Sequence, residues 1–195
     1  MMNYRYDGFV IIGVLALQGD FAEHIDVLQA LSVKEKEVRS VAELEECTHL
    51  IIPGGESTVM ARLMQSCGLW DAISERFQSG DLAVFGTCAG AILLAADIIG
   101  KHSPKGLGLI DMTIDRNAYG SQLQSFDAEI DLQDAGRVHC AFIRAPKITR
   151  VAKDVEILAS HEGHPVIVAQ GRCLACTCHP EARGESAVHR MFLGM

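Results

Sequence analysis

The first half of the chain alternates between apolar runs typical of buried strands and periodic patterns typical of helices. Residues 9–17, FVIIGVLAL, form a continuous apolar run, and residues 20–31, DFAEHIDVLQAL, repeat their apolar side chains at helical spacing. Residues 49–55, HLIIPGG, then predict a short strand and a turn, and residues 56–68 predict a second helix. Strand and helix units in this order favour a mainly parallel sheet with helices on its faces.

A third unit follows, and the pattern then changes. Residues 82–86, LAVFG, predict a strand, and residues 89–100, AGAILLAADIIG, predict an apolar helix buried on most sides. After about Gly100 the chain consists of short extended stretches, with a last short helix from Ser186. We therefore expect a single α/β domain over residues 1–195, with a mostly parallel central sheet flanked by helices and extra antiparallel strands in its second half.

Composition narrows the class of protein. A chain of 195 residues with 49% hydrophobic content can bury one sizeable core. The formal net charge of -8 argues against nonspecific binding to nucleic acid or to an anionic membrane. No apolar run has the roughly 20 residues that cross a bilayer, and the first residues lack the apolar centre of a signal peptide, so we expect a cytoplasmic location. There the seven cysteines are expected as reduced thiols.

One cysteine occupies an unusual position between two glycines. In VFGTCAGAIL, residues 84–93, a strand ends at Gly86, Cys88 follows two residues later, and Gly90 opens the next helix. This spacing matches the strand–turn–helix elbow that presents a nucleophile, where a side chain on either glycine would collide with the neighbouring strand or helix. Free N–H groups at the helix start favour a thiolate. The alternative is a buried core cysteine beside packing glycines.

A nucleophilic cysteine needs a base, and His179 has the most suitable setting. It ends an apolar strand pattern in CTCHPEARG and precedes Glu181 by two residues. In an extended segment such residues point the same way, so the Glu181 carboxylate would orient the imidazole. Cys88, His179 and Glu181 would then act as nucleophile, base and orienting group. The other seven histidines have no comparable setting, and the alternative for His179 is a partly exposed histidine at a strand end.

The glycine turn in PGGES, residues 53–57, follows the preceding strand and predicts an anion-stabilising position. The backbone N–H groups of Gly55 and Ala89 would face a developing oxyanion, a contribution of about 3 kcal/mol per donor in comparable enzymes. The alternative is a plain turn, with Ser57 or Thr58 near the N-cap of the helix that follows.

Several segments together resemble one enzyme family. GTCAG followed by HPE resembles the class I (triad) glutamine amidotransferases, which have a flavodoxin-like architecture. More specific segments resemble the glutaminase subunits of pyridoxal 5'-phosphate synthase, the PdxT or SNO family. They are GVLALQGDFAEH, LIIPGGEST, FGTCAGAILLA, DRNAYGSQLQSFDAEI, FIRAP and CHPE, in that order along nearly the whole chain.

The resemblance implies hydrolysis of L-glutamine to L-glutamate and ammonia, with Cys88, His179 and Glu181 as the triad. It implies glutamine contacts at Gly55, Glu56, Ser57, Arg116, Ile143 and Arg144. The family passes its ammonia to a separate (β/α)₈ synthase subunit that makes pyridoxal 5'-phosphate (vitamin B6). Such a barrel alone needs about 250 residues, so the acceptor site would lie on a partner. The resemblance calls for no cofactor and no metal.

Three positions depart from the family pattern. Ser121 stands where relatives carry arginine, Tyr119 replaces a phenylalanine, and Val59 replaces a threonine. None of these positions belongs to the triad, so the departures affect the surface and the substrate loop.

Two other classes of function compete with this interpretation. Cys173, Cys176, Cys178 and His179 have partial zinc-ligand spacing, but strand alternation would place Cys176 and Cys178 on one face and Cys173 and His179 on the other. A nonenzymatic redox or stress sensor of the DJ-1 kind would explain Cys88. It would give PGGES and HPE no role.

Overall fold

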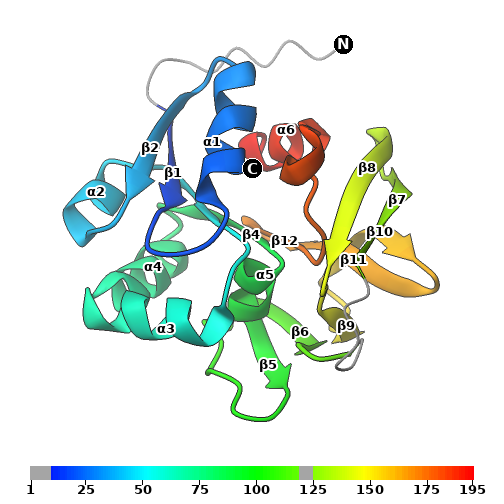
Figure 1. The fold of residues 1–195 in the computed structure, drawn as a ribbon. Helices are drawn as coiled ribbons and strands as arrows, with labels where there is room; N and C mark the ends of the chain where they lie inside the picture. Colours follow the sequence, from blue (N-terminus) through cyan, green and yellow to red (C-terminus); the bar gives the residue numbers. More distant parts are fainter. Residues whose placement is uncertain (1–9, 119–124) are drawn as a thin grey trace.

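The computed structural model describes residues 10–118 and 125–195, and its centre is a mixed sheet (Figure 1). Within these residues the sheet has seven strands, in the order β10 (Glu156–His161), β11 (His164–Gln170), β12 (Cys173–Cys176), β4 (Ala83–Thr87), β3 (His49–Ile52), β1 (Ile11–Leu15) and β2 (Lys34–Val38). The five strands from β12 to β2 pair in parallel, whereas β10 and β11 are antiparallel. The α/β class with a mostly parallel sheet and later antiparallel strands is confirmed.

Helices and two smaller sheets flank this centre in the described residues (Figure 1). One small sheet contains β5 (Ala95–Ile99), β6 (Ile110–Asp115) and β9 (Lys147–Val151), and the other is the hairpin of β7 (Ser125–Leu132) and β8 (Gly136–Ile143). The helices are α1 (Phe21–Ala30), α2 (Val41–Glu45), α3 (Ser57–Ser66), α4 (Leu69–Gln78), α5 (Ala89–Leu94) and α6 (Ala187–Leu193), with a 3₁₀ turn at Glu181–Arg183.

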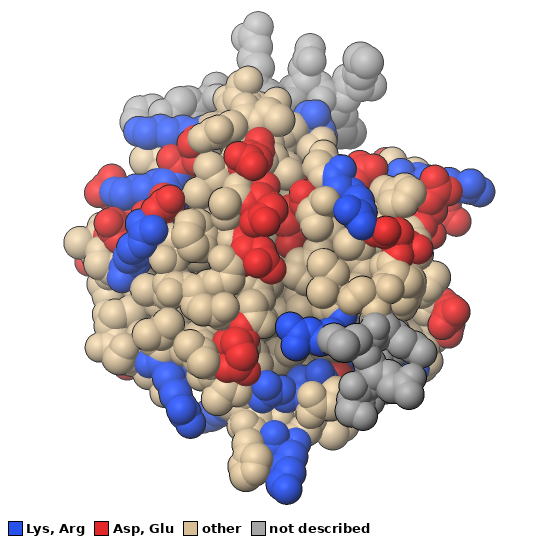
Figure 2. Space-filling view, viewed as in Figure 1, with Lys and Arg blue, Asp and Glu red and all other residues tan. Residues whose placement is uncertain are grey.

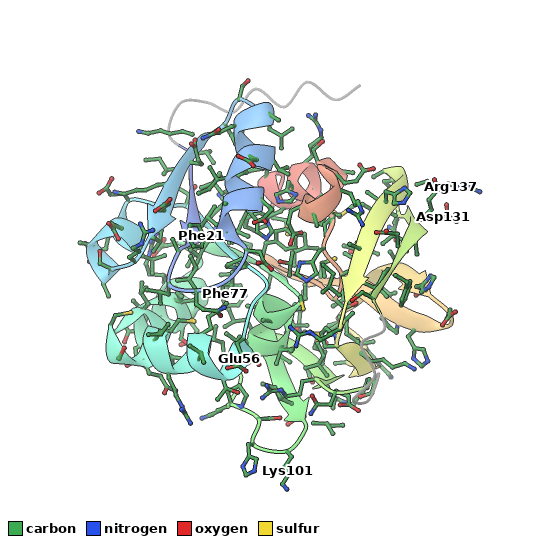
Figure 3. The ribbon with its side chains drawn as sticks, in the orientation of Figure 1. Phe21, Glu56, Phe77, Lys101, Asp131 and Arg137 are labelled. Carbon is green, nitrogen blue, oxygen red and sulfur yellow. The ribbon has the colours of Figure 1, made fainter. Side chains whose placement is uncertain are left out.

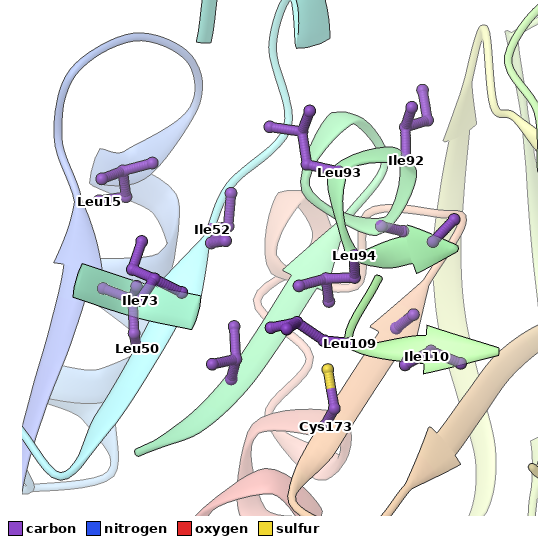
Figure 4. Packing of buried hydrophobic residues seen from close by; sticks show 14 of the residues in the cluster. Leu15, Leu50, Ile52, Ile73, Ile92, Leu93, Leu94, Leu109, Ile110 and Cys173 are labelled. Atoms are coloured by element: carbon purple, nitrogen blue, oxygen red, sulfur yellow. The ribbon is translucent and has the colours of Figure 1, made fainter. Parts of the chain in front are cut away.

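Two apolar clusters cover the two faces of the central sheet. Along β4, Val84 belongs to one cluster and Phe85 to the other, because successive side chains of a strand point to opposite faces. The first cluster joins the sheet to α3, α4, α5 and β6, and Figure 4 shows Leu50, Leu94 and Ile110 packed within it. The second cluster joins the sheet to α1, α6 and the β7–β8 hairpin. Burial on both faces explains why the inner parallel strands β1, β3 and β4 are mainly apolar, whereas the edge strand β2, KEKEV, is mostly charged.

The apolar helix expected over residues 89–100 is shorter than its pattern indicated. Helix α5 ends at Leu94, and Ala95 turns extended at φ -67° and ψ 147° to begin strand β5. The partner strand β6 decides this, since Ala95 pairs with Ile110 and Ile98 with Ile114. Tertiary pairing thus overrides a helical pattern of the local sequence.

Strand ends, rather than strand faces, define the location of the expected site. Strands β1, β3, β4 and β12 are parallel, so the residues that follow them meet at one edge of the sheet.

Basic and acidic side chains both lie on the face drawn in Figure 2. Among residues 10–118 and 125–195, no helix is long and apolar enough to span a membrane. Tyr119 and Ser121, two of the family departures, lie outside the described residues.

Candidate active site

Cys88 lies on a strained turn between β4 and α5. Its backbone has φ 47° and ψ -102°, in a region that costs a non-glycine residue about 1–3 kcal/mol. The Cys88 N–H donates to the Cys176 carbonyl at 2.8 Å, and the Cys88 carbonyl accepts from Ile92 N–H at 3.1 Å, so the turn is tied to β12 and to α5. Such strain at a strand-to-helix turn is the expected geometry of a nucleophile elbow.

Gly86 and Gly90 have the steric role that the sequence predicts. A Cβ at Gly86 would lie 2.5 Å from the Gly90 backbone, and one at Gly90 would lie 2.0 Å from the Ile52 carbonyl oxygen of β3. Both clashes are with backbone atoms, which do not move aside cheaply. The glycines therefore let α5 start directly against the sheet.

His179 and Glu181 form the expected contact, by a different backbone path. His179 Nδ1 lies 2.8 Å from Glu181 Oε1, and both side chains are buried. The backbone of His179 is fixed by a bridge to Ala141 of β8, with His179 N–H donating to the Ala141 carbonyl at 2.8 Å. The segment is not extended, however: Pro180 has φ -64° and ψ -36°, and Glu181 begins a 3₁₀ turn that brings the carboxylate back to the ring.

The electrostatics of this pair favour a charged imidazole beside the cysteine. Burial by itself lowers the pKa of His179, but its hydrogen bonds with Cys88 and Glu181 and their negative charges raise it well above the usual value. Burial by itself raises the pKa of Glu181, but the neighbouring His24 and His179 hold it well below its usual value. A protonated imidazole beside a cysteine sulfur is the arrangement that makes a thiol nucleophilic.

The glycine turn after β3 lies directly against His179. A Cβ at Gly54 would lie 2.3 Å from His179 Cε1, so only glycine fits beside the imidazole as it stands. Gly55 has φ 151°, and a Cβ there would lie 2.6 Å from Gln18 Oε1. The Gly54 carbonyl accepts from Asp20 N–H at 3.1 Å, which fixes the peptide between the two glycines. The turn expected near Cys88 is thus in contact with His179.

Glu56 has a structural role that the sequence did not indicate. It is the N-cap of α3, in place of Ser57 or Thr58, and its carboxylate accepts from the N–H groups of Thr58 at 3.3 Å and Val59 at 2.7 Å. Arg116 donates to the same carboxylate at 3.2 Å and to the Thr58 hydroxyl at 3.0 Å. Figure 3 shows Glu56 at the N-terminal end of α3. Burial by itself raises the pKa of Glu56, but these N–H groups and Arg116 lower it.

Of the remaining predicted residues, Ile143 lies against Cys88, and the others are placed on neighbouring elements. Ile143 ends β8, and its carbonyl lies 4.0 Å from Cys88 Sγ. Arg144 follows with φ 46° and is exposed, whereas Ser57 and Ala89 are buried at the first turns of α3 and α5. The structure therefore brings β4, β8 and β12 together around the cysteine, and Arg116 joins Glu56 at the start of α3.

His24 also has a polar setting near Glu181, contrary to the expectation that no other histidine has a setting comparable to that of His179. His24 Nε2 lies 3.0 Å from Thr87 Oγ1 and 3.4 Å from Glu181 Oε1, and His24 Nδ1 lies 2.9 Å from His189 Nε2. All four side chains are buried. The signal available in the sequence was position, because His24 shares the buried face of α1 with Val27 and Leu28.

The other cysteines separate as strand alternation predicts. Cys173 packs in the first apolar cluster, while Cys176 and Cys178 pack in the second with their Sγ atoms 3.3 Å apart. All seven cysteines, which lie in the described ranges, are free thiols. Burial raises the pKa of Cys173, Cys176 and Cys178, so these thiols are held in their protonated form.

A strained cysteine at a strand-to-helix turn, with a buried histidine and carboxylate beside it, is the arrangement typical of α/β proteins that use a cysteine nucleophile. Comparison with known proteins specifies the family. The profile of the SNO glutamine amidotransferase family matches residues 14–195, and this chain belongs to that family.

Similar proteins agree with this assignment. The chain is 46% identical over 183 residues to pyridoxal 5'-phosphate synthase subunit PdxT of Thermus thermophilus, covering 94% of this chain and 96% of the relative. It is 46% identical over 187 residues to the PdxT subunit of Mycobacteroides abscessus, covering 95% and 96%. A solved structure described as a glutamine amidotransferase superposes with a TM-score of 0.89 at 44% identity, covering 94% of this chain and 97% of that one.

Proposed function

We propose that this protein hydrolyses L-glutamine to L-glutamate and ammonia, and that the ammonia passes to a separate pyridoxal 5'-phosphate synthase subunit. The observation that carries the proposal is the geometry at Cys88, a cysteine held at φ 47° beside a histidine whose Nδ1 lies 2.8 Å from a buried carboxylate. Membership of a glutamine amidotransferase family indicates that the substrate is glutamine.

The reaction would proceed by acyl transfer to sulfur. The Cys88 thiolate attacks the side-chain amide carbon of glutamine, and the tetrahedral oxyanion is stabilised by the N–H groups of Gly55 and Ala89. His179 protonates the departing nitrogen, which leaves as ammonia, and a thioester remains. His179 then takes a proton from water, which attacks the thioester and releases glutamate and the Cys88 sulfur. Glu181 keeps the imidazole in one orientation throughout.

The proposed glutamine-binding residues include two arginines and one glutamate, which have different roles. Arg116 and Arg144 carry the guanidinium groups that would bind the substrate carboxylate. Glu56 is half exposed and already paired with Arg116 at 3.2 Å, so it holds that arginine in place beside the site. Backbone atoms at Gly55 and Ile143, with Ser57 at the first turn of α3, would complete the glutamine contacts.

We also propose that residues 1–195 act as one glutaminase domain with a (β/α)₈ synthase subunit as partner, without nucleic acid or membrane. The relatives named as subunits of pyridoxal 5'-phosphate synthase support the partner. A cytoplasmic location is consistent with seven free thiols, since a reducing compartment keeps cysteines unpaired.

The proposal is tested by replacing the sulfur. Cys88→Ser should abolish glutamate release, assayed with a family synthase subunit present, because a hydroxyl is far less ionised than a thiol. Cys67→Ser is the matched control, since Cys67 is half-buried at the end of α3 and its thiol donates to the Met64 carbonyl. Turnover of Cys88→Ser near the wild-type rate would refute the triad and favour the redox-sensor alternative.

A further inference from the structure

The buried polar network does not end at Glu181. Three further side chains continue it through the core: Thr87 from β4, His24 from α1 and His189 from α6, all with no exposed surface. His24 is central, because its Nε2 faces Thr87 and Glu181 while its Nδ1 faces His189. A fully buried polar chain is costly unless its protons match its acceptors.

Counting protons assigns the tautomer of His24. The Glu181 carboxylate only accepts, so the Thr87 hydroxyl donates to Glu181 Oε1 at 3.3 Å. The Thr87 oxygen then accepts from His24 Nε2 at 3.0 Å, which requires a proton on that nitrogen. An unprotonated Nε2 would instead place its lone pair 3.4 Å from the carboxylate oxygen, an unfavourable contact between two acceptors.

The same hydrogen-bond pattern determines which ring nitrogen of His189 carries the proton. With the proton of a neutral His24 on Nε2, its Nδ1 accepts, and His189 Nε2 donates to it at 2.9 Å. The single proton of His189 then lies on Nε2, and its Nδ1 has no hydrogen-bond partner among the described residues. Burial is the main cause that lowers the pKa of His189 to about 3, so His189 carries a single proton at neutral pH.

We propose that His24 is a positioning residue of this enzyme, donating from Nε2 to Thr87 and Glu181 and thereby holding the carboxylate that orients His179. The proposal rests on the triad function above. Within the described residues, Glu181 Oε1 has His179, Thr87 and His24 around it, whereas the buried Oε2 has no hydrogen-bond partner. The orientation of the carboxylate therefore depends on the Oε1 side alone. His189 acts one step further away by fixing the tautomer of His24.

Two substitutions at His24 separate its two nitrogens. In His24→Gln the side-chain amide nitrogen takes the place of Nε2 and keeps the donor toward Thr87 and Glu181. In His24→Asn the amide nitrogen takes the place of Nδ1, and that donor is lost. Because hydrogen bonds to charged groups are strong, we expect kcat to fall about 10- to 100-fold in His24→Asn and less than about threefold in His24→Gln.

Matched controls separate positioning from loss of stability. His49→Asn changes another buried histidine, one that hydrogen-bonds Thr48 and packs edge-to-face against Phe192, and it should lower Tm with kcat retained. KM for glutamine should stay within about twofold in both His24 variants, since they leave the binding residues intact. Equal kcat values for the Asn and Gln variants at similar Tm would overturn the proposal.

A spectroscopic measurement tests the tautomer without activity. In wild-type protein labelled with ¹⁵N-histidine, His24 should show a protonated Nε2 and a bare Nδ1 at pH 7. A proton on Nδ1 with a bare Nε2 would overturn the proposal even if the variants fail to fold. If wild-type protein with a synthase subunit releases no glutamate, the proposed function fails, and this measurement still decides the hydrogen-bond chain.

Discussion

Gly54 offers the sharpest test of how the glycine turn supports catalysis. A Cβ built on Gly54 lies 2.3 Å from His179 Cε1 and 3.1 Å from Nδ1, whereas ordinary contacts begin at 3.4 Å. In Gly54→Ala the imidazole must therefore retreat by about 1 Å, a misplacement that costs about 100-fold in rate. We expect kcat for glutamate release to fall by about that factor. The overpacked site should also lose about 1–3 kcal/mol of stability.

Gly184→Ala is the matched control. Gly184 ends the 3₁₀ turn that carries Glu181, has φ 66°, and no described atom lies within 4 Å of the position of its Cβ. Alanine there costs about 1–2 kcal/mol through backbone strain, with no steric contact to the site. The two variants should thus have similar losses in the free energy of unfolding, measured with urea, and different turnover. Wild-type turnover in Gly54→Ala would refute the reasoning that this glycine sets the position of the imidazole.

Three other predictions follow from the same geometry. His179→Ala should lose about 100-fold or more in turnover, and Glu181→Gln less, because the imidazole remains but is held less well; equal wild-type activity in both would contradict the triad. Gln18 Oε1 accepts from Glu56 N–H at 2.8 Å, so we expect Gln18→Ala to weaken the stimulation of glutamate release by a bound synthase subunit. Two results would contradict this coupling between Gln18 and the synthase subunit: a Gln18→Ala variant that is stimulated and bound as wild type is, or a free wild-type protein that is already fully active. Burial, with a smaller contribution from the Arg172 charge, lowers the pKa of His49 to about 4, so the unfolded state binds a proton that the folded state does not as pH falls below 6.5. Stability should therefore fall less between pH 7 and pH 5 in His49→Asn than in wild type, by urea denaturation, and an equal fall in both proteins would exclude the effect.

Much of the fold could be predicted because its signals are local. Strands β1, β3 and β4 are continuous apolar runs, and the glycines around Cys88 have fixed spacing. His179 and Glu181 are only two residues apart, so their contact could be predicted. The turn at Pro180 that brings them together could not. Periodicity and turn chemistry are properties of neighbouring residues, so a sequence displays them directly.

Other features were decided only when distant segments packed together. The end of α5 at Leu94 depends on pairing with β6, and the N-cap at Glu56 is completed by Arg116, 60 residues away. His24 and His189 hydrogen-bond across 165 residues, and nothing near either one in the sequence indicates its partner. Both faces of the sheet are buried, so a polar side chain there cannot hydrogen-bond to water. It hydrogen-bonds instead to residues that tertiary packing places beside it, and these can be distant in sequence.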